Sequence, residues 1–255
     1  MNSNEQILVV SPTADEVMQT TTGFNFGVDI PVEDLEGSTK YSVVVIAVDV
    51  SGSVGKFRKD LENSLITALE GCQMDRLSDS IIVRILLFAD NIEELIPFKE
   101  ITEIDIDKEI KGKLVIRGCT CLYDVALAGA ESLEAYSEDL FENGIMSNAT
   151  LVIITDGDNT VGTKNTPAMV ADTVKRIRFS EKVESIKTIV VAVNEDKYYA
   201  DIIENFADEM DKDQFIWMKD LTSKGFARLG GFLSSSVSSS AQALGTGSPS
   251  KSLNF

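Results

Sequence analysis

From residue 41 onward, apolar and polar residues follow two alternating patterns along the chain. Short apolar runs rich in Val and Ile predict buried strands. Between these runs, apolar residues recur at helical spacing, as Phe57, Leu61, Leu65 and Leu69 do, and this spacing predicts helices that bury one face. The predicted strands are 42–49, 80–89, 92–98, 149–155, 186–193 and 214–218, and the predicted helices lie at about 55–72, 121–142, 166–180, 197–209 and 221–242.

Strands that alternate with helices indicate an α/β fold with helices on both faces of a mostly parallel sheet. Because crossovers between parallel strands are right-handed, we expect a doubly wound, six-stranded sheet in the order 3-2-1-4-5-6. The segment 92–98 follows its neighbour after only a turn, at Asp90 and Asn91. It is therefore expected to be a short antiparallel edge strand.

Three regions of the chain differ in pattern. Residues 1–40 are polar and Thr-rich, with strand-like pieces at 6–10 and 24–30, and are expected to be an N-terminal extension that packs on the domain or frays. Residues 41–240 form the domain. Residues 241–255 are Gly/Ser-rich and are expected to be a disordered tail. The serines at 234–240 are expected to lie on a solvated helix end.

The charge balance excludes several classes of function. The chain carries 23 Lys+Arg against 41 Asp+Glu, a formal net charge of −18. A nucleic-acid or anionic-membrane surface needs a basic footprint, so neither partner is expected. Histidine is absent, which excludes Ser-His-Asp and Cys-His catalysis and every zinc site that contains His.

Cysteine usage and the N-terminal sequence favour a cytoplasmic protein. The three cysteines are Cys72, Cys119 and Cys121, an odd number without a spaced framework, which fits a reducing compartment. We expect all three to be small buried residues. The start, "MNSNEQILVV", has neither a basic region nor a long apolar region, and the longest apolar run, at 43–48, is far shorter than a membrane helix.

Oxygen-bearing side chains follow two of the buried strands. "VVVIAVDVSGSVG" (43–55) leads from a strand into Asp49, Ser51 and Ser53, and "LVIITD" ends at Asp156. In the predicted order, the first and fourth strands are neighbours about 4.8 Å apart, so the two aspartates would lie side by side at the carboxyl edge. Because two such carboxylates repel each other, a cation between them is expected. Ser51, Ser53 and Thr120 would add neutral oxygens, a set that suits Mg²⁺, or Mn²⁺ in its place.

These residues resemble the metal-ion-dependent adhesion site of von Willebrand factor A domains. The resemblance covers roughly residues 41–220 and rests on Asp-x-Ser-x-Ser, a Thr in "RGCTCLYD" and an Asp in "ITDGDN", in that order. It implies that Asp49, Ser51, Ser53, Thr120 and Asp156 hold the metal and that the metal captures an Asp or Glu of a partner protein. The segment "GFLSSSVSSSAQ" also looks like the end of intracellular bacterial and phage A-domain proteins of the tellurite-resistance type. This resemblance implies protein kinase and phosphatase partners.

Simpler interpretations compete with the metal site. Capping of helix N-termini explains one Asp or Ser in each loop, but not five residues that converge from three loops. Asp124 is expected to complement a helix dipole, and Asp158 to be a solvated turn residue. The alternative function is a Mg²⁺-dependent, phosphatase-like hydrolase that uses Asp49. Its general acid would stand at Ser51, where no acid is present, so we expect a binding module and not an enzyme.

Overall fold

The computed structural model describes residues 9–35, 38–246 and 252–255, and its elements alternate as the sequence pattern predicts. The strands are β1 (Glu16–Gln19), β2 (Asn25–Val28), β3 (Lys40–Asp49), β4 (Ile81–Phe88), β5 (Ile92–Glu100), β6 (Met146–Thr155), β7 (Ile186–Val193) and β8 (Gln214–Met218). The α-helices are α1 (Arg58–Gln73), α2 (Ile106–Glu109), α3 (Leu122–Glu142), α4 (Pro167–Phe179), α5 (Lys197–Glu209) and α6 (Ser223–Ala243). Short 3-10 turns are η1 (Val32–Asp34), η2 (Gly52–Phe57), η3 (Ser78–Ser80) and η4 (Ile101–Glu103).

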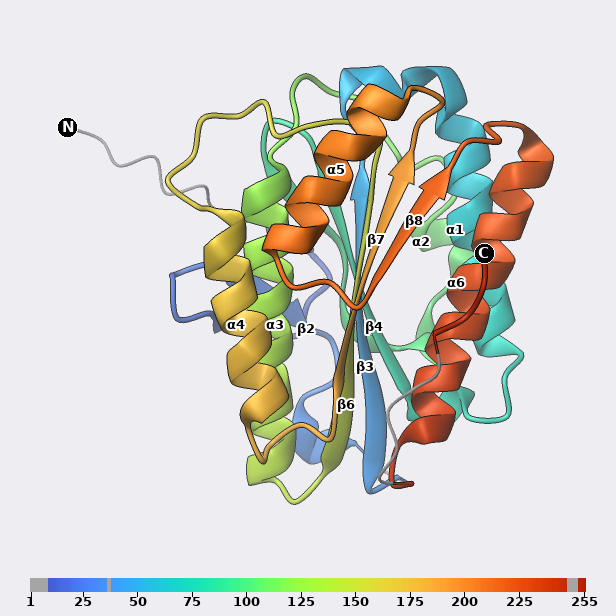
Figure 1. Ribbon diagram of the computed structural model, residues 1–255. Coiled ribbons are helices and arrows are strands. Elements are labelled where there is room, and N and C mark those ends of the chain that lie inside the picture. Colours follow the sequence, from blue (N-terminus) through green and yellow to red (C-terminus); the bar gives the residue numbers. More distant parts are fainter. Residues whose placement is uncertain (1–8, 36–37, 247–251) are drawn as a thin grey trace.

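The sheet is doubly wound and covered on both faces. Its order is β1-β2-β5-β4-β3-β6-β7-β8, and β4, β3, β6, β7 and β8 run parallel. Helices α3, α4 and α5 lie on one face, and α1 and α6 lie on the other (Figure 1). Each face has its own buried apolar core. The predicted α/β fold is therefore confirmed, and the six predicted strands keep their predicted neighbours.

Two strands from the N-terminal extension make the sheet larger than predicted. The sheet has eight strands and not six, because β1 and β2 form an antiparallel pair that adds to β5 through Val28 and Phe98. β5 is antiparallel to β4, as expected, but it is not an edge strand. Val9 adds an isolated bridge to Glu93, whereas residues 6–8 of the first strand-like piece lie outside the described residues.

A buried ion pair joins this hairpin to the sheet. Arg84 of β4 and Glu94 of β5 are fully buried, and the Arg84 Nε donates to the Glu94 Oε1 at 2.6 Å. The rings of Phe26 and Phe98 lie 5.5 and 5.6 Å from the guanidinium carbon. Glu94 also accepts hydrogen bonds from the backbone N–H of Gly27. The charge pair is thus enclosed by residues from both sides of the β2–β5 contact.

Parts of the predicted disordered tail, residues 241–255, pack on the domain. Helix α6 continues to Ala243, and Leu253 and Phe255 pack against the core beside it. The Phe255 ring lies 5.7 Å from that of Phe232, and the Gln214 side chain donates to the Leu253 carbonyl at 2.6 Å. Residues 247–251 of the predicted disordered tail lie outside the described residues. Within the described ranges, no helix has the length and apolar character needed to cross a membrane.

Candidate metal centre

Asp49 is the last residue of β3, and its side chain is fully buried at the carboxyl end of the sheet. Its Oδ1 accepts a hydrogen bond from the Ser51 backbone N–H at 2.8 Å, and its Oδ2 accepts one from the Thr155 hydroxyl at 2.6 Å. Burial raises the pKa of Asp49 to about 6; the hydrogen bonds from Ser51 and Thr155 oppose the rise, and the charge of Asp156 adds to it. The two hydrogen bonds therefore only partly offset the cost of burying this charge.

Asp156 follows the last residue of β6, the strand that pairs with β3. The Ser53 hydroxyl donates to the Asp156 Oδ1 at 2.7 Å, and the Ser51 and Ser53 hydroxyl oxygens lie 3.1 Å apart. Burial raises the pKa of Asp156, whereas the hydrogen bond from Ser53 and the charge of Lys56 lower it. Since Ser53 is exposed and Ser51 is buried, this series of oxygens leads from the surface toward the interior.

Thr120 belongs to a third segment, the loop before α3, and it is buried. Its backbone N–H donates to the Thr160 hydroxyl at 2.8 Å, and its carbonyl accepts hydrogen bonds from the backbone N–H groups of Thr160 and Val161 at 2.9 and 3.1 Å. Thr160 and Val161 lie in the loop that follows Asp156. The Thr120 loop is therefore attached to the Asp156 loop by three hydrogen bonds.

The Thr120 loop is also attached to the turn after β3. The Gly52 backbone N–H donates to the Gly118 carbonyl at 3.1 Å. A Cβ added at Gly118 would lie 2.2 Å from the Asp90 carboxylate, so a side chain there would displace this group, which accepts the Cys119 backbone N–H at 2.8 Å. The three loops thus form one surface at the end of the sheet where β3 and β6 finish.

The structure brings together the three loops that carry the five predicted ligands, and Thr120 is joined to the Asp156 loop through its backbone. Their side chains offer two carboxylates and three hydroxyls, which are oxygen donors of the kind that Mg²⁺ and Mn²⁺ accept. In the described part of the chain, no three Asp, Glu or Cys side chains gather as a metal-binding group. The candidate centre is therefore poor in negative charge, with hydroxyls in place of further carboxylates.

Asp124 lies at the helix start where it was expected to complement the dipole, and it has a second role. It lies in the first turn of α3 but is fully buried, and its Oδ1 accepts hydrogen bonds from the Thr163 hydroxyl and the Asn165 amide, both at 2.6 Å. It therefore also anchors the loop after β6. Asp158 is half-buried in that loop and accepts the Asn159 backbone N–H at 2.7 Å.

The cysteines are free thiols with two different environments. Cys72 and Cys121 are buried, as predicted, but Cys119 is exposed. Burial raises the pKa of the Cys121 thiol, and the charges of Asp124 and Asp49 add to the rise. The residue after Thr120 therefore lies within electrostatic reach of the Asp49 carboxylate. Cys119 is exposed because it lies in the loop turn that Asp90 caps.

Sequence reasoning missed the residues that support the centre. Thr155 and Asn194 are the main ones, since the Asn194 amide donates to the Asp156 carbonyl at 2.6 Å. Both are polar residues at the carboxyl ends of buried strands, and this position is the sequence feature by which they could have been predicted.

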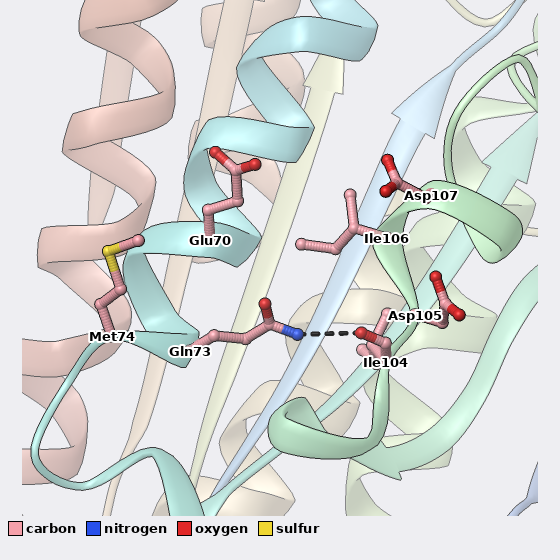
Figure 2. Close-up of a pocket in the computed structure, with 7 residues that line it drawn as sticks. All are labelled: Glu70, Gln73, Met74, Ile104, Asp105, Ile106 and Asp107. Carbon is pink, nitrogen blue, oxygen red and sulfur yellow. Dashed lines mark hydrogen bonds between the residues drawn. The ribbon is translucent and has the colours of Figure 1, made fainter.

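A groove of about 500 Å³ lies elsewhere, between the last turn of α1 and α2, where Gln73 donates to the Ile104 carbonyl (Figure 2). It lies at the opposite end of α1 from the candidate centre.

The fold is similar to that of known pilus proteins. No protein-family model matches the sequence, and a search of curated proteins gives no match. A mutant of the PilB minor pilin from Streptococcus sanguinis matches with a TM-score of 0.57 and 11% identity, over 85% of this chain and 64% of that one. The pilus adhesin SpaC from Lactobacillus rhamnosus GG, in an open conformation, matches with a TM-score of 0.57 and 13% identity, over 78% of this chain and 30% of that one.

A third match is the ArnB paralog VWA2 from Sulfolobus acidocaldarius, with a TM-score of 0.49 and 17% identity, over 78% of this chain and 46% of that one. This lower TM-score does not support a shared fold by itself. The chain corresponds to less than two thirds of each of these three proteins. At these identities, the likeness to PilB and SpaC shows a shared fold alone.

Proposed function

We propose that the chain is a von Willebrand factor A-type domain that binds a partner protein through a Mg²⁺ ion. The observation that carries this proposal is the convergence of Asp49, Ser51, Ser53, Thr120 and Asp156 from three loops that are hydrogen-bonded to one another. These residues would hold the metal through oxygen atoms, directly or through water. Mn²⁺ would serve in its place.

The composition of the site favours capture of an acidic side chain. Three of the five ligands are neutral hydroxyls, so a bound divalent cation would keep part of its charge and attract an anionic ligand from outside. An Asp or Glu of a partner protein supplies such a ligand. Two proteins of similar fold, a minor pilin and a pilus adhesin, are compatible with a binding role.

The surroundings of Asp49 support binding over turnover. Both oxygens of Asp49 accept a hydrogen bond that fixes the buried carboxylate in place, and each oxygen keeps a lone pair for a metal ion or for a metal-bound water. Ser51 stands where the hydrolase alternative needs a general acid. We therefore propose that the protein is not an enzyme. Its three free cysteines fit a cytoplasmic location. The resemblance of "GFLSSSVSSSAQ" to tellurite-resistance-type proteins supports a place in a multiprotein assembly linked to kinases and phosphatases in a stress response.

Titration with Mn²⁺, followed by paramagnetic relaxation of water protons, tests the metal site. Wild type is expected to bind one ion weakly, because the site offers only two carboxylates, and Asp49→Asn and Thr120→Val are expected to weaken binding at least about tenfold. Asp158→Asn is the matched control, since it removes a carboxylate of a neighbouring residue outside the proposed set. Equal affinity in all four proteins would overturn the assignment.

A phosphatase assay separates the two candidate functions. With Mg²⁺ and p-nitrophenyl phosphate, we expect no turnover above that of the buffer. Hydrolysis by the wild type that disappears in Asp49→Asn would make the hydrolase the better assignment.

A further inference from the structure

Two tyrosines lie together on the surface at the start of α5. Tyr198 is 66% exposed and Tyr199 is 43% exposed, and their rings meet edge to face with centroids 5.4 Å apart. Helix α5 packs on the core through other residues, namely Ala200, Ile203, Phe206 and Ala207. Core packing therefore does not require two large aromatic rings at these positions.

Hydrogen bonds connect the tyrosine pair to the candidate metal centre. The Asn194 amide donates to the Asp156 carbonyl at 2.6 Å, the Asp196 backbone N–H donates to the Asn194 Oδ1 at 2.8 Å, and the Tyr198 backbone N–H donates to the Asp196 Oδ1 at 2.9 Å. The start of α5 is at the same end of the molecule as the turn that precedes α1 (Figure 1). The position of the tyrosines is thus fixed relative to that of Asp156.

Two lysines lie at this end of the molecule, where the loop before α5 also carries Glu195 and Asp196. Lys56 is close enough to Asp156 to lower the pKa of that carboxyl, and Lys219 lies with its Nζ 3.6 Å from the centre of the Trp217 ring. The Trp217 indole N–H donates to the Asn194 carbonyl at 2.7 Å, so Trp217 of β8 is hydrogen-bonded to the loop that precedes the tyrosines. Either lysine would attract an acidic residue of a partner.

We propose that the Tyr198–Tyr199 pair is the second contact point of the metal-site surface. It receives a bulky apolar side chain that adjoins the acidic residue held at the metal. The partner is therefore an extended acidic segment of another protein, in which Asp or Glu is flanked by an aromatic or aliphatic residue. This inference rests on the proposed function. Exposed Tyr rings that are held in place suit this role, because they offer a large contact area and lose little entropy on binding.

Two capped synthetic peptides test the inference, with NMR titration in Mg²⁺ as the measurement. One peptide is Gly-Gly-Gly-Asp-Gly-Gly-Gly, and the other has Phe on both sides of the Asp. The Phe-flanked peptide is expected to bind at least about tenfold more tightly to the wild type. The double variant Tyr198→Ser/Tyr199→Ser is expected to lose most of this preference while keeping its affinity for the Gly-flanked peptide.

The matched control is Phe179→Ser, which removes an 82% exposed aromatic ring from the far end of α4 and is expected to keep the preference. If both peptides bind in Mg²⁺ with equal affinity, or if the double tyrosine variant keeps the preference, the inference is wrong and the proposed function stands. If neither peptide binds, or if Asp49→Asn and EDTA leave binding unchanged, the proposed function fails and the inference fails with it.

Discussion

Burial of the ionised Asp49 carboxylate lowers the stability of the folded protein. It ends the central strand β3, it is fully buried, and its pKa is raised to about 6 from an ordinary value of 3.8, first by burial. A raised carboxyl pKa means that the folded state binds the proton more tightly than the unfolded state does. Without metal, stability is therefore lowest when Asp49 is ionised.

This cost predicts a pH dependence of the metal-free protein. In EDTA, the contribution of Asp49 to the free energy of unfolding should increase as the pH falls from above 6 toward 3.8, by up to about 3 kcal/mol. Asp49→Asn should lack this contribution and should unfold at pH 7.5 at no lower urea concentration than the wild type does. Urea unfolding of both proteins between pH 5 and 7.5 measures the difference. A variant that is much less stable at pH 7.5, with an unchanged pH slope, would contradict the prediction.

At the residue scale, the sequence predicted the candidate ligands but not their supports. Asp49, Ser51 and Ser53 stand in one short motif, so their proximity follows from local chain geometry. Thr155 and Asn194 contact the site through side chains that are 106 and 38 residues away in sequence from the groups they bind. Such pairings depend on how neighbouring strands end, which the periodicity of one strand does not specify.

At the element scale, helix α6 lies against α1 through small residues. An added Cβ at Gly230 would lie 2.6 Å from the Ser64 carbonyl, and one at Gly71 would lie 2.3 Å from the Ser234 hydroxyl. Ser236 and Ser240 are buried in the same helix, so the predicted solvated helix end is wrong for them. Small side chains let the two helices come close together, which explains a Ser- and Gly-rich sequence in a buried helix.

Two neighbouring glycines of α6 should respond to alanine in opposite ways. Gly230→Ala should lower the free energy of unfolding by about 1–3 kcal/mol, because its Cβ meets the backbone of α1. Gly231→Ala meets nothing within 4 Å and should raise it by about 0.5–1 kcal/mol through helix propensity. Urea unfolding of the two variants checks both values. If the two changes had the same sign, the close contact between α1 and α6 would be in doubt.

Element prediction succeeded where periodicity was sustained and failed where it was short. The predicted strands 186–193 and 214–218 and the predicted helix 197–209 have the observed bounds. β1 has only four residues and buries none of them fully, so its sequence shows no alternation. Its position depends on pairing with β2, which is tertiary information.

At the scale of the whole molecule, the N-terminal hairpin belongs to the same core as the main domain. Phe26 is fully buried, meets Phe98 edge to face at 5.7 Å, and shares one buried cluster with Tyr136 of α3. The hairpin of the N-terminal extension therefore packs on the domain and shares its core. Composition set the predicted boundary at residue 40, because the extension is polar, and composition does not report which few apolar residues of a polar segment are buried.

The shared core predicts a single cooperative unfolding transition. Phe26→Ala should lower the stability of the whole protein by about 3–5 kcal/mol, as expected for loss of a buried aromatic ring. Val17→Ala, in the same hairpin but 58% exposed, should change it by less than about 0.5 kcal/mol. Denaturation followed by both tryptophan fluorescence and circular dichroism gives the measurement. If Phe26→Ala left the main transition unmoved, the hairpin would be an independent appendage.

The hairpin also covers part of a sheet edge that could pair with strands of other molecules. The N-terminal extension pairs with the outer edge of β5 at two points, Val28 with Phe98 and Val9 with Glu93, so a chain without the extension would leave this edge open beside Phe98. Such an edge is a template for strands of other copies, and it leads to aggregation. A chain shortened to the regularly alternating region would keep all five candidate ligands but expose this edge, and we expect it to aggregate. The segment without candidate ligands therefore determines whether the binding surface remains available in solution.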